Sequence, residues 1–152
     1  MDIMSRQYAI AVALCALTGS ACDENLKDIA GPTPNLEPTL SSIQREIFSA
    51  SDSTGRAACI QCHTNVGRPP AVPGFLLTEG QSYQSLVGRA SVNKPGAVNV
   101  IAGDPDGSYL IQKLEGSAGI AGLRMPRNGP PYLTEGQISI IRRWIELGAK
   151  ND

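Results

Sequence analysis

Two cysteines and a histidine at fixed spacing are the residues of this 152-residue chain best suited to chemistry. Cys59, Cys62 and His63 form the pattern C-x-x-C-H. Two thiols at this spacing can add to the two vinyl groups on one edge of a haem and become thioethers, and the imidazole that follows can bind the iron. The spacing therefore predicts one covalently attached haem c, with Cys59 and Cys62 as attachment sites and His63 as an iron ligand.

Three other chemistries use a similar pair of cysteines. A thioredoxin-like redox pair needs a strand before it and a helix after it in a βαβ unit, and no such alternation surrounds Cys59. A structural zinc site needs two further Cys or His ligands, but His63 is the only histidine and no cysteine follows Cys62. A plain disulfide across a tight loop is the remaining alternative. We favour the haem over the disulfide, and the disulfide over zinc.

Met125 is the residue best suited to the second axial position of such an iron. Met1 and Met4 lie in a predicted export signal, so Met125 is the only thioether expected in the mature chain. It follows a Gly122-Leu-Arg stretch and precedes a proline, in a loop between two predicted helices. A single methionine usually fills a gap in a core, yet beside a haem with no second histidine a thioether is the expected sixth ligand. Lysine or water would be the replacements.

The composition bounds the class of protein. Acidic and basic residues nearly balance, 14 against 13, and no basic run occurs, so nothing indicates a nucleic-acid partner. The length is enough for one domain. Aromatic residues make up only 5% of the chain, and a core so poor in large rings is marginal at this length. A buried macrocycle would supply the missing apolar mass.

Residues 1–21 have the pattern of an export signal. The basic Arg6 precedes an apolar run of roughly ten residues, which is too short to span a bilayer. Small side chains then lead to Cys22, in a stretch that resembles a bacterial lipobox with Gly19 in place of the usual leucine. The resemblance implies a lipid on Cys22, which would also remove an unpaired thiol from an oxidising compartment. Ordinary cleavage at the same bond is the alternative.

The Pro-containing residues 22–38 predict a flexible tether, and the folded domain is expected over residues 39–152. Thr39 is the expected N-cap of a first helix that ends near residue 50. The pentapeptide Leu-Thr-Glu-Gly-Gln occurs twice and predicts two capping boxes. The expected helices are 39–50, 79–87, one from Asp104-Pro105 to Gly116, and 135–147.

The order of these features resembles the class I monohaem cytochromes c, over about residues 39–149. The resemblance rests on the C-x-x-C-H motif, on Met125-Pro126, and on a final amphipathic helix that carries Trp144. It implies an all-α fold of about four to five helices around one covalently bound haem. The stretch from Arg124 to the end is similar to cytochrome c domains of exported bacterial proteins. One departure is the segment 49–58, because compact members place the first helix almost against the motif.

An iron with histidine and methionine ligands has no open position for a substrate. The sequence therefore predicts a one-electron carrier and not an enzyme, exported to the periplasm or a membrane surface, where it would meet redox partner proteins. Two alternatives follow from the same residues. If Met125 does not bind the iron, an open position would suit a sensor of diatomic gases or a weak peroxidase. The domain would otherwise be the redox subunit of a larger dehydrogenase or oxidase.

Overall fold

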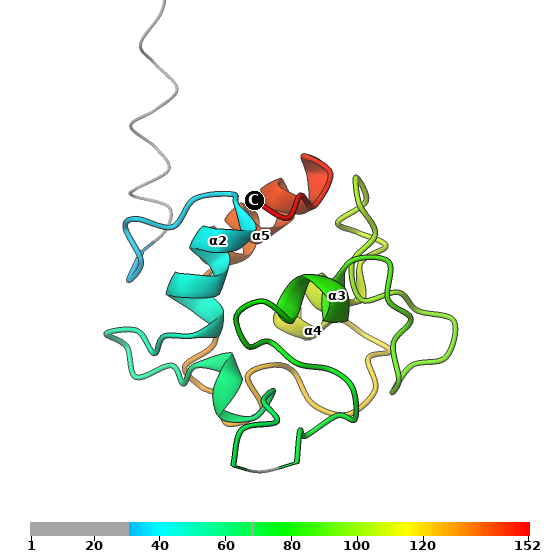
Figure 1. Ribbon diagram of the computed structural model, residues 1–152. Helices are drawn as coiled ribbons and strands as arrows, with labels where there is room; N and C mark the ends of the chain where they lie inside the picture. The colour runs from blue at the N-terminus through cyan, green and yellow to red at the C-terminus, as the bar shows by residue number, and fades with distance from the viewer. Residues whose placement is uncertain (1–30, 68) are drawn as a thin grey trace, which may run out of the picture.

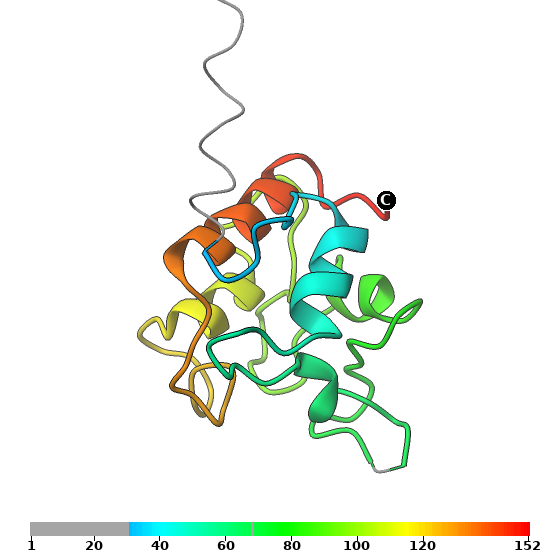
Figure 2. The ribbon, with the colours of Figure 1, turned by 90° about the vertical axis from the view of Figure 1, so that its left-hand side faces the viewer.

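Short helices joined by long irregular segments make up the part of the chain that the structure describes. The computed structural model describes residues 31–67 and 69–152 (Figures 1 and 2). The predicted export signal and Cys22 lie outside these residues. The elements in chain order are α2 (Leu40–Ile43), the π-helical turn η1 (Gln44–Phe48), the 3₁₀ turn η2 (Cys59–Gln61), α3 (Ser82–Leu86), α4 (Tyr109–Glu115) and α5 (Glu135–Glu146).

The expected class I cytochrome c fold, all-α with four to five helices around the haem, is wrong. The longest described helix, α5, has 12 residues, and the other three α-helices have four, five and seven. The described residues contain no strand, and pairs such as Val87 with Val100 are isolated bridges. The 16 glycines and 11 prolines explain the difference, because both residue types interrupt helices and supply turns. Hydrophobic packing then holds helices that are too short to be stable alone.

The first predicted helix exists but is divided. The Thr39 hydroxyl accepts a hydrogen bond from the Ser42 amide at 3.2 Å, so Thr39 is the N-cap that the sequence predicts. The helical segment continues through η1 and ends at Phe48. The N–H of the C-cap residue Ser49 donates to the Gln44 carbonyl. Both halves bury their apolar side chains, which join one core.

Helix α5 matches its prediction closely. Thr134 and Gln137 form a complete capping box: each side chain accepts a hydrogen bond from the other residue's backbone N–H. Trp144 is only 1% exposed, and its indole N–H donates to the Lys150 carbonyl at 2.9 Å. Helix α4 packs against α5, so this C-terminal helix is central to the core.

The other copy of the pentapeptide does not cap a helix. Helix α3 begins at Ser82 with Gln81 as its N-cap residue, and the Thr78 hydroxyl donates to the Gln81 side chain instead of accepting from the backbone. The predicted capping box at 78–81 is therefore wrong. The two copies provide a matched pair for testing what a cap contributes.

We expect Thr134→Ala to lower the free energy of unfolding by about 1 kcal/mol, because the Gln137 amide loses its acceptor. The same substitution at Thr78, in an identical pentapeptide, should change the free energy by clearly less. Urea denaturation of both variants gives the comparison. Equal losses at the two positions would contradict the assignment of the cap.

Helix α4 begins later than the sequence predicts. The Asp104 carboxylate accepts a hydrogen bond from the Gly107 amide, so residues 104–107 form a turn, and Ser108 precedes the first helical residue. The predicted end is confirmed, because Gly116 adopts a left-handed φ of 76°. A Cβ at Gly116 would also lie 2.9 Å from Arg124 Cδ, which adds a steric reason for glycine.

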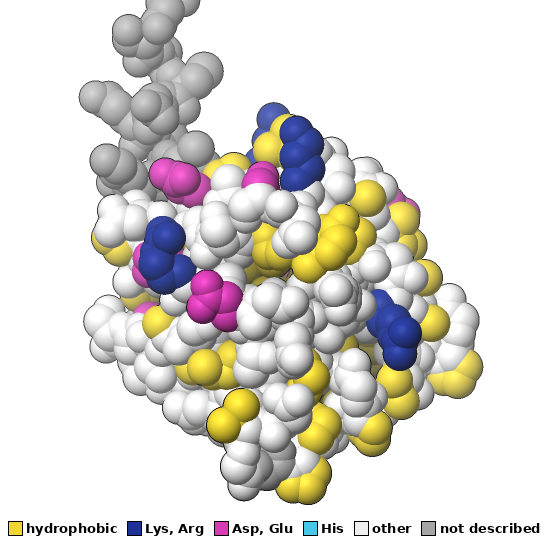
Figure 3. Space-filling model, in the orientation of Figure 1, with side chains coloured by type: hydrophobic (Ala, Val, Ile, Leu, Met, Phe, Trp, Pro, Cys, Tyr) yellow, Lys and Arg dark blue, Asp and Glu magenta, His cyan; other side chains and the backbone are white. Residues whose placement is uncertain are grey.

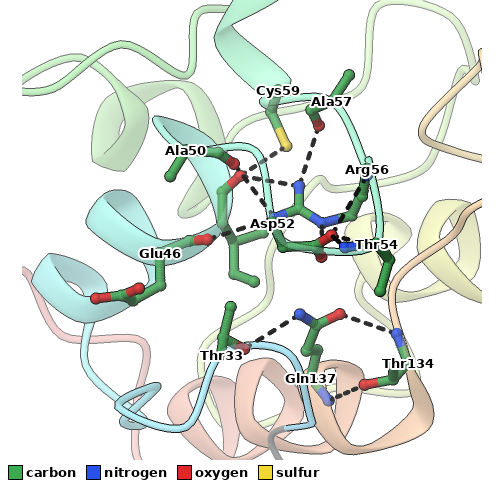
Figure 4. Close-up of polar contacts among 11 residues, drawn as sticks. Thr33, Glu46, Ala50, Asp52, Thr54, Arg56, Ala57, Cys59, Thr134 and Gln137 are labelled. Carbon is green, nitrogen blue, oxygen red and sulfur yellow. Dashed lines mark hydrogen bonds and ion pairs between the residues drawn. The ribbon is translucent and has the colours of Figure 1, made fainter.

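Part of the predicted tether packs on the domain. Thr33 and Leu36 are 4% and 3% exposed. The Gln137 side-chain amide donates to the Thr33 hydroxyl at 3.1 Å, which links this segment to the capping box of α5 (Figure 4). The ordered chain therefore begins before Thr39. Among the described residues no helix is long and apolar enough to cross a membrane.

Candidate functional site

A cavity of about 720 Å³ lies between the C-x-x-C-H turn and the loop that carries Met125. Cys59, Cys62, His63 and Met125 all line it, so the four residues selected from the sequence share one site. Its volume lies in the usual range for small-molecule and cofactor pockets, which is about 300–1,000 Å³. The turn and the loop lie at the end of the molecule away from the C-terminal end of α5 (Figures 1 and 2).

A tight turn sets the positions of the two thiols. The amides of Cys62 and His63 both donate to the Cys59 carbonyl, at 3.1 and 2.9 Å. Cys59 packs against the core. Its thiol donates to the Ile47 carbonyl at a sulfur–oxygen distance of 3.6 Å. Burial raises the pKa of the Cys59 thiol to about 11, although the nearby Arg56 charge lowers it. Cys62 is exposed, and the two cysteines are not joined by a disulfide.

His63 lies on the same wall with its ring against an aromatic side chain. The Phe75 ring meets it edge to face with the centroids 5.0 Å apart, and the His63 carbonyl accepts from Leu77 N–H at 2.9 Å. Burial lowers the pKa of the imidazole, and the positive charge of Lys113 lowers it further. The ring is therefore biased toward its neutral form, which is the form that binds metals.

The second nitrogen of His63 differs from what a haem ligand usually shows. Among the described residues Nδ1 is buried and has no hydrogen-bond partner. The sequence suggests a backbone carbonyl near Pro70 or Pro73 as its acceptor, and no such bond forms. The loop instead contacts the turn through Ala71 N–H, which donates to the Cys62 carbonyl at 3.1 Å.

Met125 lines the cavity from the loop that follows α4. Its side chain is half-buried and packs against the core. Its amide donates to the Lys113 carbonyl at 2.8 Å, so helix α4 holds the loop in place. The apolar part of the lining comes from side chains of several elements: Ile47, Phe48, Leu110, Leu114 and Leu133.

Arg56 is a buried cation that the sequence analysis missed. It is 1% exposed and its Nε donates to the Asp52 carboxylate at 3.0 Å (Figure 4). Its two terminal nitrogens donate to four backbone carbonyls at 3.1–3.4 Å, those of Glu46, Ile47, Ala50 and Ala57. Arg56 therefore joins the end of η1 to the residues just before Cys59. This network orders the segment 49–58, and Phe48 still lines the cavity.

The Asp52 carboxyl gives this network a pH dependence. Burial raises its pKa, but hydrogen bonds from Thr54 and Arg56 and the charge of Arg56 outweigh that effect, so the pKa of Asp52 lies below its ordinary value of 3.8. A carboxyl with a lowered folded-state pKa contributes stability above its unfolded-state pKa. That contribution is lost as the pH falls through the folded-state pKa.

We therefore expect Asp52→Asn to flatten the acid side of the stability profile. In the parent chain the free energy of unfolding should fall as the pH drops below about 4, and in the variant this fall should be shallower. Urea denaturation from pH 6 downward measures both curves. Asp106→Asn, which removes an exposed carboxylate, is the matched control and should leave the slope nearly unchanged. A parallel loss in the parent and Asp52→Asn would contradict the prediction.

One face of the molecule carries few charges toward this end. In Figure 3 the charged side chains lie in the upper and middle parts of the view, while hydrophobic and other uncharged side chains cover much of the lowest part. Val66, Val92 and Leu123 are 75%, 56% and 61% exposed, and the last two also line the cavity. The cavity entrance therefore has an apolar edge.

The donor atoms fit a haem better than the alternatives. Two thiols on one turn are available for covalent bonds, and one imidazole and one thioether are available for a metal. Within the described ranges no three His, Cys, Asp or Glu side chains gather as a metal site. The apolar lining suits a large planar ring.

A scan of protein-family models, a search of curated proteins and a search of solved structures find no match for this chain. The function is therefore inferred from the residues of the site alone.

Proposed function

We propose that this chain carries one haem c, attached through Cys59 and Cys62, and transfers single electrons between partner proteins. His63 and Met125 are the proposed axial ligands of its iron. The observation that carries the proposal is that Met125, distant in the sequence from the C-x-x-C-H motif, lines the same cavity. When bound, the haem supplies the iron couple that accepts and releases one electron.

The residues of the chain have distinct tasks in this proposal. Cys59 and Cys62 would hold the haem: each S–H would add across one vinyl group, the sulfur forming the thioether and the hydrogen going to the other vinyl carbon. The neutral imidazole of His63 offers a lone pair, while Phe75 limits how its ring can turn. Met125 would offer a soft thioether as a second ligand to the iron, and such a ligand would favour the reduced state. The apolar lining excludes water from the ring.

The proposed location is the bacterial periplasm, with the domain held at a membrane by a lipid on Cys22. The support is the sequence pattern alone, because Cys22 lies outside the described residues. A chain with this anchor should partition into detergent when expressed with its own leader, and Cys22→Ser should remain in the aqueous phase. Equal partition of both chains would leave a periplasmic carrier without an anchor.

The test of covalent attachment is a comparison of the parent chain with Cys59→Ser/Cys62→Ser, both made in a host that matures haem c. The parent should keep its haem after denaturation in acid and organic solvent, and its intact mass should include the haem. The double variant should lose it. If the parent holds no haem despite working maturation, the proposal fails, and a disulfide between Cys59 and Cys62 becomes the favoured alternative.

A further inference from the structure

Helix α4 binds the backbone of alternate residues in the segment that leads to Met125. The Lys113 ammonium donates to the Ala121 carbonyl at 2.8 Å and also to the Leu123 carbonyl. The Lys113 carbonyl accepts from the Met125 amide at 2.8 Å. One residue of α4 therefore binds the backbone of every second residue of the segment from 121 to 125.

Tyr109, one helical turn before Lys113, binds the same segment. Its hydroxyl accepts a hydrogen bond from the Ala121 amide at 2.9 Å. Ala121 is thus bound through both its N–H and its carbonyl, by two side chains that stand one above the other on α4. Tyr109 is 5% exposed, so the acceptor itself is held by the core.

The neighbouring Arg124 makes two further contacts. Its Nε donates to the Leu114 carbonyl at 2.7 Å, and its guanidinium lies 4.2 Å from the centre of the Tyr132 ring. The loop before and at Met125 is therefore fastened to α4, although the loop has no regular secondary structure of its own.

We infer that Lys113 is the positioning residue of Met125: its ammonium and its carbonyl hold the loop at the distance from α4 at which the thioether faces the cavity. This inference rests on the proposed function. Partners that orient a metal ligand commonly change metal affinity or activity by about 10–100-fold when removed. A ligand on an irregular loop depends on them more than one on a helix, because the loop backbone is otherwise free to move.

The test uses the haem-loaded chain with Lys113→Leu, which removes the ammonium and introduces no new iron ligand. We expect the far-red band of sulfur-to-ferric-iron charge transfer to weaken, and added imidazole to bind the iron about tenfold more tightly. Lys113→Arg should restore both properties, since a guanidinium can donate to both carbonyls but does not bind iron. Lys150→Leu, which removes an exposed lysine at the C-terminal end, is the charge-matched control and should resemble the parent.

A second variant protects the test against misfolding. Tyr109→Phe removes only the acceptor for Ala121, so it should shift imidazole affinity in the same direction by a few-fold. Far-UV circular dichroism checks that each variant is folded. If Lys113→Leu and Tyr109→Phe both keep the band and the imidazole affinity of the parent, the inference is overturned while the proposed function stands.

Hydrogen exchange separates failure of this inference from failure of the proposed function. If the parent holds no covalent haem, the proposed function fails, and the exchange of residues 121–125 in the haem-free chain then decides the role of Lys113. Faster exchange in Lys113→Leu than in Lys150→Leu supports the positioning role. Unchanged exchange overturns it.

Discussion

Met125→Ala is expected to abolish the far-red charge-transfer band of the oxidised protein and to lower its reduction potential. The variant should also bind added imidazole at least about tenfold more tightly, a change of about 1.4 kcal/mol. With the proposed ligation, an incoming ligand would have to displace the thioether in the parent, whereas in the variant it would meet only water. The removed thioether also favours the reduced iron, which gives the direction of the change in potential. Absorption spectra, an imidazole titration and a redox titration measure the three effects.

Leu123→Ala is the matched control for this substitution. Leu123 lies on the same loop, lines the same cavity and is 61% exposed, so its truncation changes the lining without changing a proposed ligand. The control should keep the band and the potential. If Met125→Ala also keeps them, Met125 does not bind the iron, and an open sixth position would suit a gas sensor or a weak peroxidase better than a carrier.

Arg56→Leu is expected to lower the free energy of unfolding by about 3–5 kcal/mol, which is typical when one partner of a buried ion pair is removed. The substitution leaves the Asp52 carboxylate 1% exposed without its cation. Four backbone carbonyls also lose a donor in a region that water does not reach easily. Chemical denaturation of the parent and the variant under the same ligand state gives the difference.

Arg45→Leu separates the effect of burial from the effect of charge. The Arg45 side chain is 64% exposed and pairs only with its neighbour Glu46 among the described residues, so its removal should change the free energy of unfolding by no more than about 0.5 kcal/mol. Arg56→Lys should fall between the two, because one ammonium cannot reach five acceptor contacts. Similar losses for Arg45→Leu and Arg56→Leu would contradict a structural role for the buried network.

The residues of the candidate site could be selected from the sequence because they are few and chemically distinct. The chain has one histidine, and only one methionine follows the predicted signal, so the C-x-x-C-H motif and Met125 had no competitors. They meet in one cavity because α4, which holds the loop of Met125, and the turn at Cys59 both line it. The last helix was equally accessible, since its capping box and its apolar face agree with each other.

The fold was harder to predict, because local sequence signals compete with tertiary contacts that cannot be recognised in the sequence. Thr78 and Thr134 are the second residues of identical pentapeptides, yet only Thr134 caps a helix, where the Gln137 side chain also binds Thr33. Arg56 looks like a solvated residue in a small polar segment, and its burial depends on carbonyls contributed by η1. For Lys113 one signal existed: it lies four residues after Tyr109, on a helix that is otherwise largely apolar on that side.

The contact between Thr33 and Gln137 has a consequence for how far the domain can travel. If Cys22 carries the lipid, only about ten residues remain between the anchor and the first packed residue, and such a stretch spans at most roughly 35 Å. The domain would then reach partner proteins only within a short distance of the membrane, unlike a freely diffusing carrier. Since Thr33 packs beside α5 and the C-x-x-C-H turn lies toward the other end of the molecule (Figures 1 and 2), the proposed site would face away from an anchor at Cys22.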